Sequence, residues 1–137
     1  MTNLDAVREI YDAIERGDTD AVLAHYASDV EWDFSRSPFR PVVKQTVYRG
    51  HGEVRAFIRE RYEEAWSEVS DQLDELSEVG DQVVSVVTSA GRGRVSGAEV
   101  AVTHAGLWSF RDGKVTRVAW FATADEALAA AGSGQTR

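Results

Sequence analysis

The sequence predicts one α+β domain in which helices come first and a curved, mixed or antiparallel sheet follows. Apolar residues recur every three or four positions near the N-terminus, and they alternate with polar residues toward the C-terminus. The chain has 137 residues, which is the ordinary size of a domain with its own hydrophobic core. We therefore expect a single domain over residues 1–131 and a disordered tail over residues 132–137.

Three helices are predicted in the first half of the chain. The first covers Leu4–Arg16, and Gly17 with Asp18 ends it. Its apolar side chains share one face: Leu4, Val7, Ile10, Tyr11 and Ile14. The second helix is short, Thr19–Tyr26, and the third covers Gly52–Ser67 with one continuous apolar stripe. These apolar faces require a common surface on which to pack.

The first predicted strand is Asp29–Ser35, where Val30, Trp32 and Phe34 alternate with polar residues. A long connection, residues 35–52, follows it and contains both prolines of the chain. Long connections beside a pocket are often functional lids.

Four further strands are predicted toward the C-terminus. Residues 72–79 keep helical spacing, but one helix from 52 to 79 would be unusually long, so a strand is favoured. Residues 82–90, 100–110 and 115–121 are rich in β-branched residues, and Asp112-Gly113 is typical of a tight hairpin. Thr123 to Glu126 predicts a capping box that opens a helix ending at Ala131.

Composition excludes several function classes. The net charge of −8 and the pI of about 4.8 disfavour nucleic acid by Coulomb repulsion. The chain lacks cysteine, a signal-peptide pattern and any apolar run of about 20 residues, so we expect a cytoplasmic protein without a membrane partner. Its three histidines share no metal-ligand spacing, and the sequence predicts neither metal nor cofactor.

Several short segments together resemble a known family. They are Arg16-Gly17-Asp18, the stretch TDAVLAHYASDVEW after it, Tyr48-Arg49-Gly50-His51, and the ending GLWSFRDGKVTRVAWFATADEAL. In their order and spacing the chain resembles the nuclear-transport-factor-two-like superfamily, and within it the SnoaL-like, polyketide-cyclase-type proteins.

The resemblance implies a cone-shaped fold in which the curved sheet wraps around three helices and leaves a pocket. Members include isomerases, epoxide hydrolases, cyclases, dehydratases and non-catalytic binding modules, and many are dimers that pack through the sheet. The predicted strands carry apolar residues on both faces, for example Val84 and Leu107 against Val83 and Trp108. A homodimer packed through the sheet is therefore expected.

Two residues are candidates for the catalytic base. Enzymes of the family place a carboxylate near the end of the first strand, where this chain has Phe34, with Asp33 one residue earlier. His104 is the second candidate, because imidazole titrates near neutral pH, although a hydrogen-bonded core or interface histidine is the favoured interpretation of this residue. Arg92 or a tyrosine could stabilise a developing oxyanion, although Arg92 could also be an exposed strand residue.

A large set of aromatic residues predicts an apolar pocket for a polycyclic or terpenoid ligand, or for another small apolar or weakly acidic molecule. Part of this set would belong to the ordinary core. The expected pocket residues are Tyr11, Trp32, Tyr62, Trp66, Arg92, Trp108 and Trp120. The favoured function is cofactor-free acid–base chemistry on an apolar substrate that isomerises, cyclises or is hydrolysed. The alternative is a non-catalytic ligand-binding or dimeric interaction domain.

Overall fold

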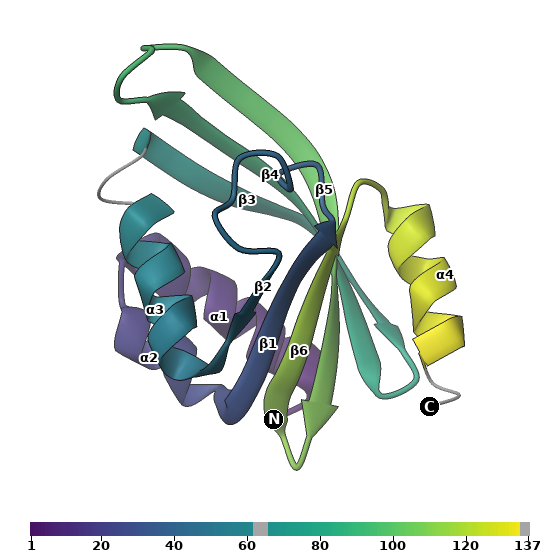
Figure 1. Cartoon of the computed structure of the whole chain (residues 1–137). Coiled ribbons are helices and arrows are strands. Elements are labelled where there is room, and N and C mark those ends of the chain that lie inside the picture. The colour runs from purple at the N-terminus through teal and green to yellow at the C-terminus, as the bar shows by residue number, and fades with distance from the viewer. Residues whose placement is uncertain (62–65, 135–137) are drawn as a thin grey trace.

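The computed structural model describes residues 1–61 and 66–134, and these form the predicted α+β fold (Figure 1). In chain order the elements are α1 (Asn3–Arg16), α2 (Thr19–Ala24), β1 (Tyr26–Arg36), β2 (Val47–Arg49), α3 (Gly50–Arg59), β3 (Trp66–Val79), β4 (Gln82–Gly93), β5 (Glu99–Arg111), β6 (Lys114–Phe121) and α4 (Ala124–Gly134). Within the described residues, no helix is long and apolar enough to cross a membrane.

The strands form one mixed sheet in the order β2-β1-β6-β5-β4-β3. All neighbouring pairs are antiparallel except β1 and β6, which run parallel with Trp32 beside Val118. The first long strand of the chain is therefore paired with the last. The β5–β6 turn has positive φ at both Asp112 (53°) and Gly113 (78°), which is the hairpin geometry expected for this residue pair.

The concave face of the sheet packs on α1, α2 and α3, as the cone-shaped fold requires (Figure 1). Helix α1 contributes Val7 and Ile10, and α3 contributes Val54, all of them fully buried. The amphipathic pattern of α1 thus places its apolar stripe against the sheet. Thr2 and Asp5 form a capping box at its start, and Gly17, in the left-handed conformation with φ of 71°, ends it.

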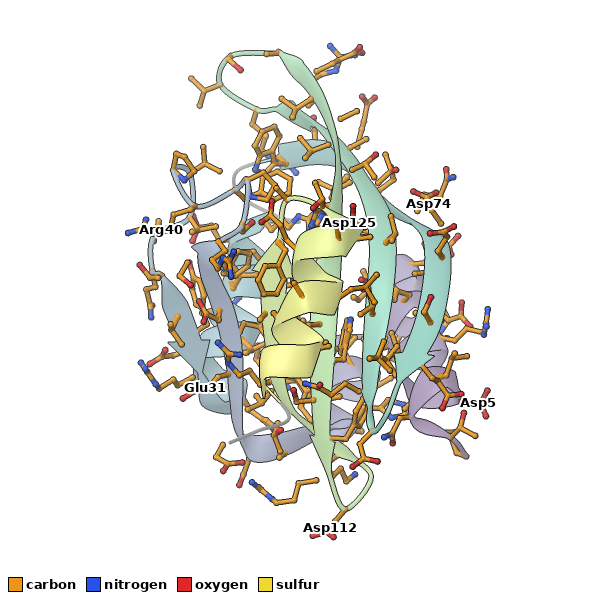
Figure 2. The ribbon with its side chains drawn as sticks, turned by 90° about the vertical axis from the view of Figure 1, so that its right-hand side faces the viewer. Asp5, Glu31, Arg40, Asp74, Asp112 and Asp125 are labelled. Atoms are coloured by element: carbon orange, nitrogen blue, oxygen red, sulfur yellow. The ribbon has the colours of Figure 1, made fainter. Side chains whose placement is uncertain are left out.

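Helix α4 lies on the opposite, outer face of the sheet, as Figure 2 shows. It covers a second apolar cluster made of Val84, Ala105, Leu107, Ala119, Phe121, Ala127 and Ala131. Part of the apolar outer surface that suggested a dimer is therefore buried within the same chain. The homodimer stays a prediction. Helix α4 also extends three residues beyond its predicted end, and residues 135–137 lie outside the described part.

The boundary between α3 and β3 differs from the sequence-based prediction. Helix α3 ends at Arg59, and Trp66 and Ser67, which were expected in the helix, begin the edge strand β3. Cross-strand pairing of Trp66 with Gly93 outweighs their helical spacing. A register shift at Glu68, which has φ of 54°, lets the strand continue past this point.

Two smaller differences surround β1. The short strand β2 falls inside the predicted connection of residues 35–52 and pairs with β1, Tyr48 beside Trp32. Helix α2 ends at Ala24, so Tyr26, expected at its end, opens β1 instead.

Candidate functional site

An apolar cavity of about 110 Å³ lies between the concave face of the sheet, helices α1 and α3, and the connection between β1 and β2. Five of the predicted pocket residues line it: Tyr11, Trp32, Trp66, Trp108 and Trp120. Tyr62 lies outside the described residues. Sequence reasoning missed four further aromatic lining residues: Phe34, Phe39, Tyr48 and Phe57. Phe39 comes from the proline-containing connection, which thus covers one side of the cavity.

Strand β1 separates the aromatic wall of the cavity from Asp33. Successive side chains of a strand point to opposite faces, so Trp32 and Phe34 line the cavity and Asp33 does not. Asp33 instead forms an ion pair with Arg117 of β6 and accepts a 2.8 Å hydrogen bond from the Ser35 amide. Partial burial raises the pKa of Asp33, but the Ser35 hydrogen bonds and the Arg117 charge outweigh this effect and hold it below its ordinary value. Asp33 is therefore placed outside the cavity, and its role as the catalytic base stays an untested prediction.

Arg92 is also outside the cavity. It lies near the β4–β5 turn with its side chain 42% exposed, and it forms ion pairs with Glu68 and Glu99. It also donates a hydrogen bond of 3.1 Å to the carbonyl oxygen of Gly97. Its neighbour Gly91 lines the cavity in its place. The guanidinium thus belongs to a surface network outside the cavity, and the prediction that Arg92 binds a ligand oxygen stays untested.

His104 is placed on the cavity wall and belongs to a chain of polar side chains. Its Nε2 atom is 2.9 Å from Ser89 Oγ, and that hydroxyl donates a 2.6 Å hydrogen bond to Asp71 Oδ1. Arg61 Nη2 donates to the same carboxylate oxygen at 2.8 Å. All four residues line the cavity. Asp71 and Ser89 are direct cross-strand neighbours in β3 and β4, which brings the chain together.

This chain determines which ring nitrogen of His104 carries the proton. Ser89 has one hydroxyl proton, and it goes to the ionised carboxylate of Asp71, which can only accept. Ser89 must therefore accept from Nε2–H of His104, which leaves Nδ1 as an unprotonated acceptor. Burial, and secondarily the charge of Arg61, lowers the pKa of His104 to about 4. The imidazole is neutral at physiological pH.

A second buried hydroxyl fixes two of the aromatic residues. Ser85 Oγ accepts a 2.9 Å hydrogen bond from Trp108 Nε1 and lies 3.1 Å from the Tyr11 hydroxyl. Burial raises the pKa of Tyr11, so the phenol stays protonated. Tyr11 is thus a neutral, hydrogen-bonded wall of the cavity, and its hydroxyl is occupied by Ser85.

The polar chain could have been detected from the strand alternation. Inward positions of β4 and β5 are occupied by apolar residues or glycine except at Ser85, Ser89 and His104. A polar residue at an inward position needs a partner. The pairing register that joins Ser89 to Asp71 depends on the bulges of β3, and these have no clear sequence signal. Among the described residues, no cluster of three or more potential metal ligands occurs.

A curved mixed sheet that closes with three helices around an apolar cavity defines the NTF2-like class of α+β proteins. Residues 7–118 match the family of SnoaL-like domains, and the chain belongs to this family. A search of the curated proteins finds no match.

Solved structures agree with this assignment. An NTF2-like protein of unknown function from Burkholderia pseudomallei K96243 is 30% identical, with a TM-score of 0.76 over 94% of this chain and 97% of the other. An NTF2-like protein from Burkholderia thailandensis E264 is 27% identical, with a TM-score of 0.78 over 96% and 98% of the chains. A proposed polyketide cyclase from Xanthomonas campestris pv. campestris is 21% identical, with a TM-score of 0.68 over 94% and 96%, and this likeness supports the fold alone.

Proposed function

We propose that the protein binds a small, mainly apolar molecule in this cavity and that His104 acts on it as a general base. One observation carries the proposal: a buried, neutral imidazole whose Nδ1 atom has no partner among the described residues stands on an aromatic cavity wall. Nδ1 is closed to solvent, and Phe39 packs edge-on against the imidazole with ring centroids 5.1 Å apart, so a ligand reaches Nδ1 by displacing this ring. The free lone pair of a neutral imidazole can then accept a proton, and a dry site strengthens its interactions.

The cavity volume limits the size of the ligand. An engineered protein cavity of about 150 Å³ binds benzene, and this cavity measures about 110 Å³. A single ring or a short branched chain therefore fits better than the polycyclic molecule that the number of aromatic residues suggested. A larger ligand would require residues 37–46, which supply Phe39, Val42 and Val43 to the wall, to move outward.

The polar chain gives His104 a means of holding the proton that it takes up. Proton transfer from a substrate C–H or O–H bond to Nδ1 leaves an anionic substrate and an imidazolium ion. The Nε2–H group keeps its hydrogen bond to Ser89, and the Asp71 carboxylate behind Ser89 stabilises the positive charge. Ser89 and Asp71 thus serve as positioning residues.

The low pKa of His104 favours a second candidate function, ligand binding without catalysis. The protonated form of His104 has a pKa of about 4. This pKa is below the range in which a general base is most effective at neutral pH. In this case Nδ1 would only accept a hydrogen bond from the ligand. The two candidates share the cavity and differ in whether a proton leaves the substrate.

A two-stage experiment separates these candidates. A thermal-shift screen of neutral single-ring and polycyclic compounds, at fixed pH and salt, tests binding; a ligand at a hundred times its Kd adds about 2.7 kcal/mol of stability. Each ketone that binds is then incubated in deuterium oxide, and exchange of its α-protons is followed by proton NMR. Catalysis predicts exchange that is lost in His104→Gln and kept in Asp33→Asn, which lies outside the cavity. Binding without exchange supports the second candidate, and a screen without any stabilisation contradicts both.

A further inference from the structure

The ion pair between Arg61 and Asp71 lies in the cavity wall and is mostly buried. The Arg61 side chain, just beyond the end of α3, is 24% exposed, and the Asp71 side chain of β3 is 6% exposed. In every other ion pair within the described residues, at least one side chain is 45% exposed or more. The desolvation cost of a buried ion pair often exceeds its attraction. The position of this pair therefore points to a role other than stability.

Arg61 and His104 compete for one counter-ion, the Asp71 carboxylate. Oδ1 of Asp71 accepts from Arg61 Nη2 at 2.8 Å and from Ser89 Oγ at 2.6 Å, and Ser89 lies 2.9 Å from Nε2 of His104. A guanidinium group always carries its charge, whereas an imidazole is charged only after it takes up a proton. Because Arg61 already neutralises the carboxylate, a positive charge on His104 has no counter-ion left in this polar chain.

The hydrogen bonds of the polar chain do not by themselves keep His104 neutral. Nε2–H donates to Ser89 in the neutral tautomer, and it does so equally in the imidazolium ion. The choice between the two forms is therefore made by burial and by charge. Burial, and after it the Arg61 guanidinium, disfavours the imidazolium ion, and the Asp71 carboxylate favours it.

Two other ionisable side chains of the described cavity wall do not compete for this role. Glu60 pairs with Lys44 of the connection between β1 and β2 at 3.4 Å. Burial raises the pKa of Tyr11, so this phenol is uncharged. Among the described residues, the charges that act on the imidazole are those of Arg61 and Asp71.

We infer that Arg61 is a positioning residue for His104: it holds the Asp71 carboxylate as its own counter-ion, and His104 thereby stays an uncharged proton acceptor. The catalytic meaning of this inference rests on the proposed function, because a base that already carries a proton cannot take one from a substrate. The charge of His104 is measured without any ligand. Failure of the inference is therefore distinguishable from failure of the proposed function.

Titration of the histidine ring protons by NMR, at fixed salt, tests the inference. The chain has three histidines, and the signal that is lost in His104→Gln belongs to His104. Arg61→Gln keeps a hydrogen-bond donor for Asp71 and removes the charge, so the titration midpoint of His104 should rise from about 4 by about one pH unit or more. Arg61→Lys restores the charge and should return the midpoint to its value in the unmodified protein. Arg55→Gln is the matched control, because Arg55 of α3 pairs with Asp20 at the surface, and it should leave the midpoint unchanged.

A double variant separates the action through Asp71 from direct repulsion between Arg61 and His104. In Arg61→Gln combined with Asp71→Asn the carboxylate is absent, so the rise of the midpoint should disappear. A rise that persists in the double variant, or no rise in Arg61→Gln, overturns the inference. Asp71→Asn alone is a test that does not depend on the folding of Arg61→Gln. It leaves the guanidinium without this counter-ion and should lower the midpoint, and an equal or higher midpoint overturns the inference.

Discussion

Acidification is expected to destabilise the protein through His104. In the unfolded chain this imidazole takes up a proton near its ordinary pKa of 6.5, and in the folded protein only near a pKa of about 4. Between these values the unfolded state binds more protons than the folded state, so the free energy of unfolding falls as the pH falls. The stability that depends on neutral His104 is complete above about pH 6.5 and is lost progressively toward pH 4.

The size of the effect follows from the two pKa values. A difference of one pKa unit corresponds to about 1.4 kcal/mol, and the folded-state pKa of about 4 lies well below 6.5. Acidification from about pH 7 to about pH 4.5 should therefore remove about 2 kcal/mol of unfolding free energy. The folded protein lowers the pKa of Asp33, so the unfolding free energy that depends on this carboxylate is lost only below its ordinary pKa of 3.8. The window above pH 4.5 thus reports mainly on the histidine.

Urea unfolding followed by tryptophan fluorescence at a series of pH values measures this dependence. His104→Gln keeps an amide donor within reach of Ser89 and removes the titration, so its stability should change much less across the same window. His25→Gln serves as the matched control, because His25 pairs with Glu9 at the surface and lies outside the cavity. The reasoning is refuted if the unmodified protein and His104→Gln show the same pH dependence.

Three further substitutions test the packing and the site assignment. A methyl group on Gly106 would lie 2.7 Å from the Trp120 ring, so Gly106→Ala should cost about 1–3 kcal/mol in urea unfolding; Gly52→Ala, with nothing within 4 Å, is the control and should cost less. Ser85→Ala leaves a buried indole donor unpaired and should cost about 1–3 kcal/mol; an unchanged midpoint would contradict this hydrogen bond. Asp33→Asn should cost at most about 1 kcal/mol and leave ligand affinity unchanged, and a large loss of affinity would return Asp33 to the site.

The fold class and five aromatic residues of the cavity wall could be predicted from the sequence, because both depend on local periodicity. The alternation in β1 places Trp32 and Phe34 on one face, and this same alternation removes Asp33 from the cavity. The role of Arg92 could not be predicted, because its counter-ions Glu68 and Glu99 reach it through the pairing of three strands. The chain from Asp71 to His104 likewise depends on strand register, which bulges shift without a local sequence signal.

The parallel pairing of β1 with β6 has a consequence for how the protein folds. Trp32 lies in β1 and is synthesised early. Trp120 lies beside it in the cavity wall but belongs to the last strand, β6. Contacts between such distant segments carry a large loop-closure entropy and slow the folding of a domain. During synthesis β1 has no partner on this side until β6 leaves the ribosome. The cavity is therefore among the last parts of the molecule to form. A chain that ends before β6 lacks Trp120 and cannot complete the cavity wall.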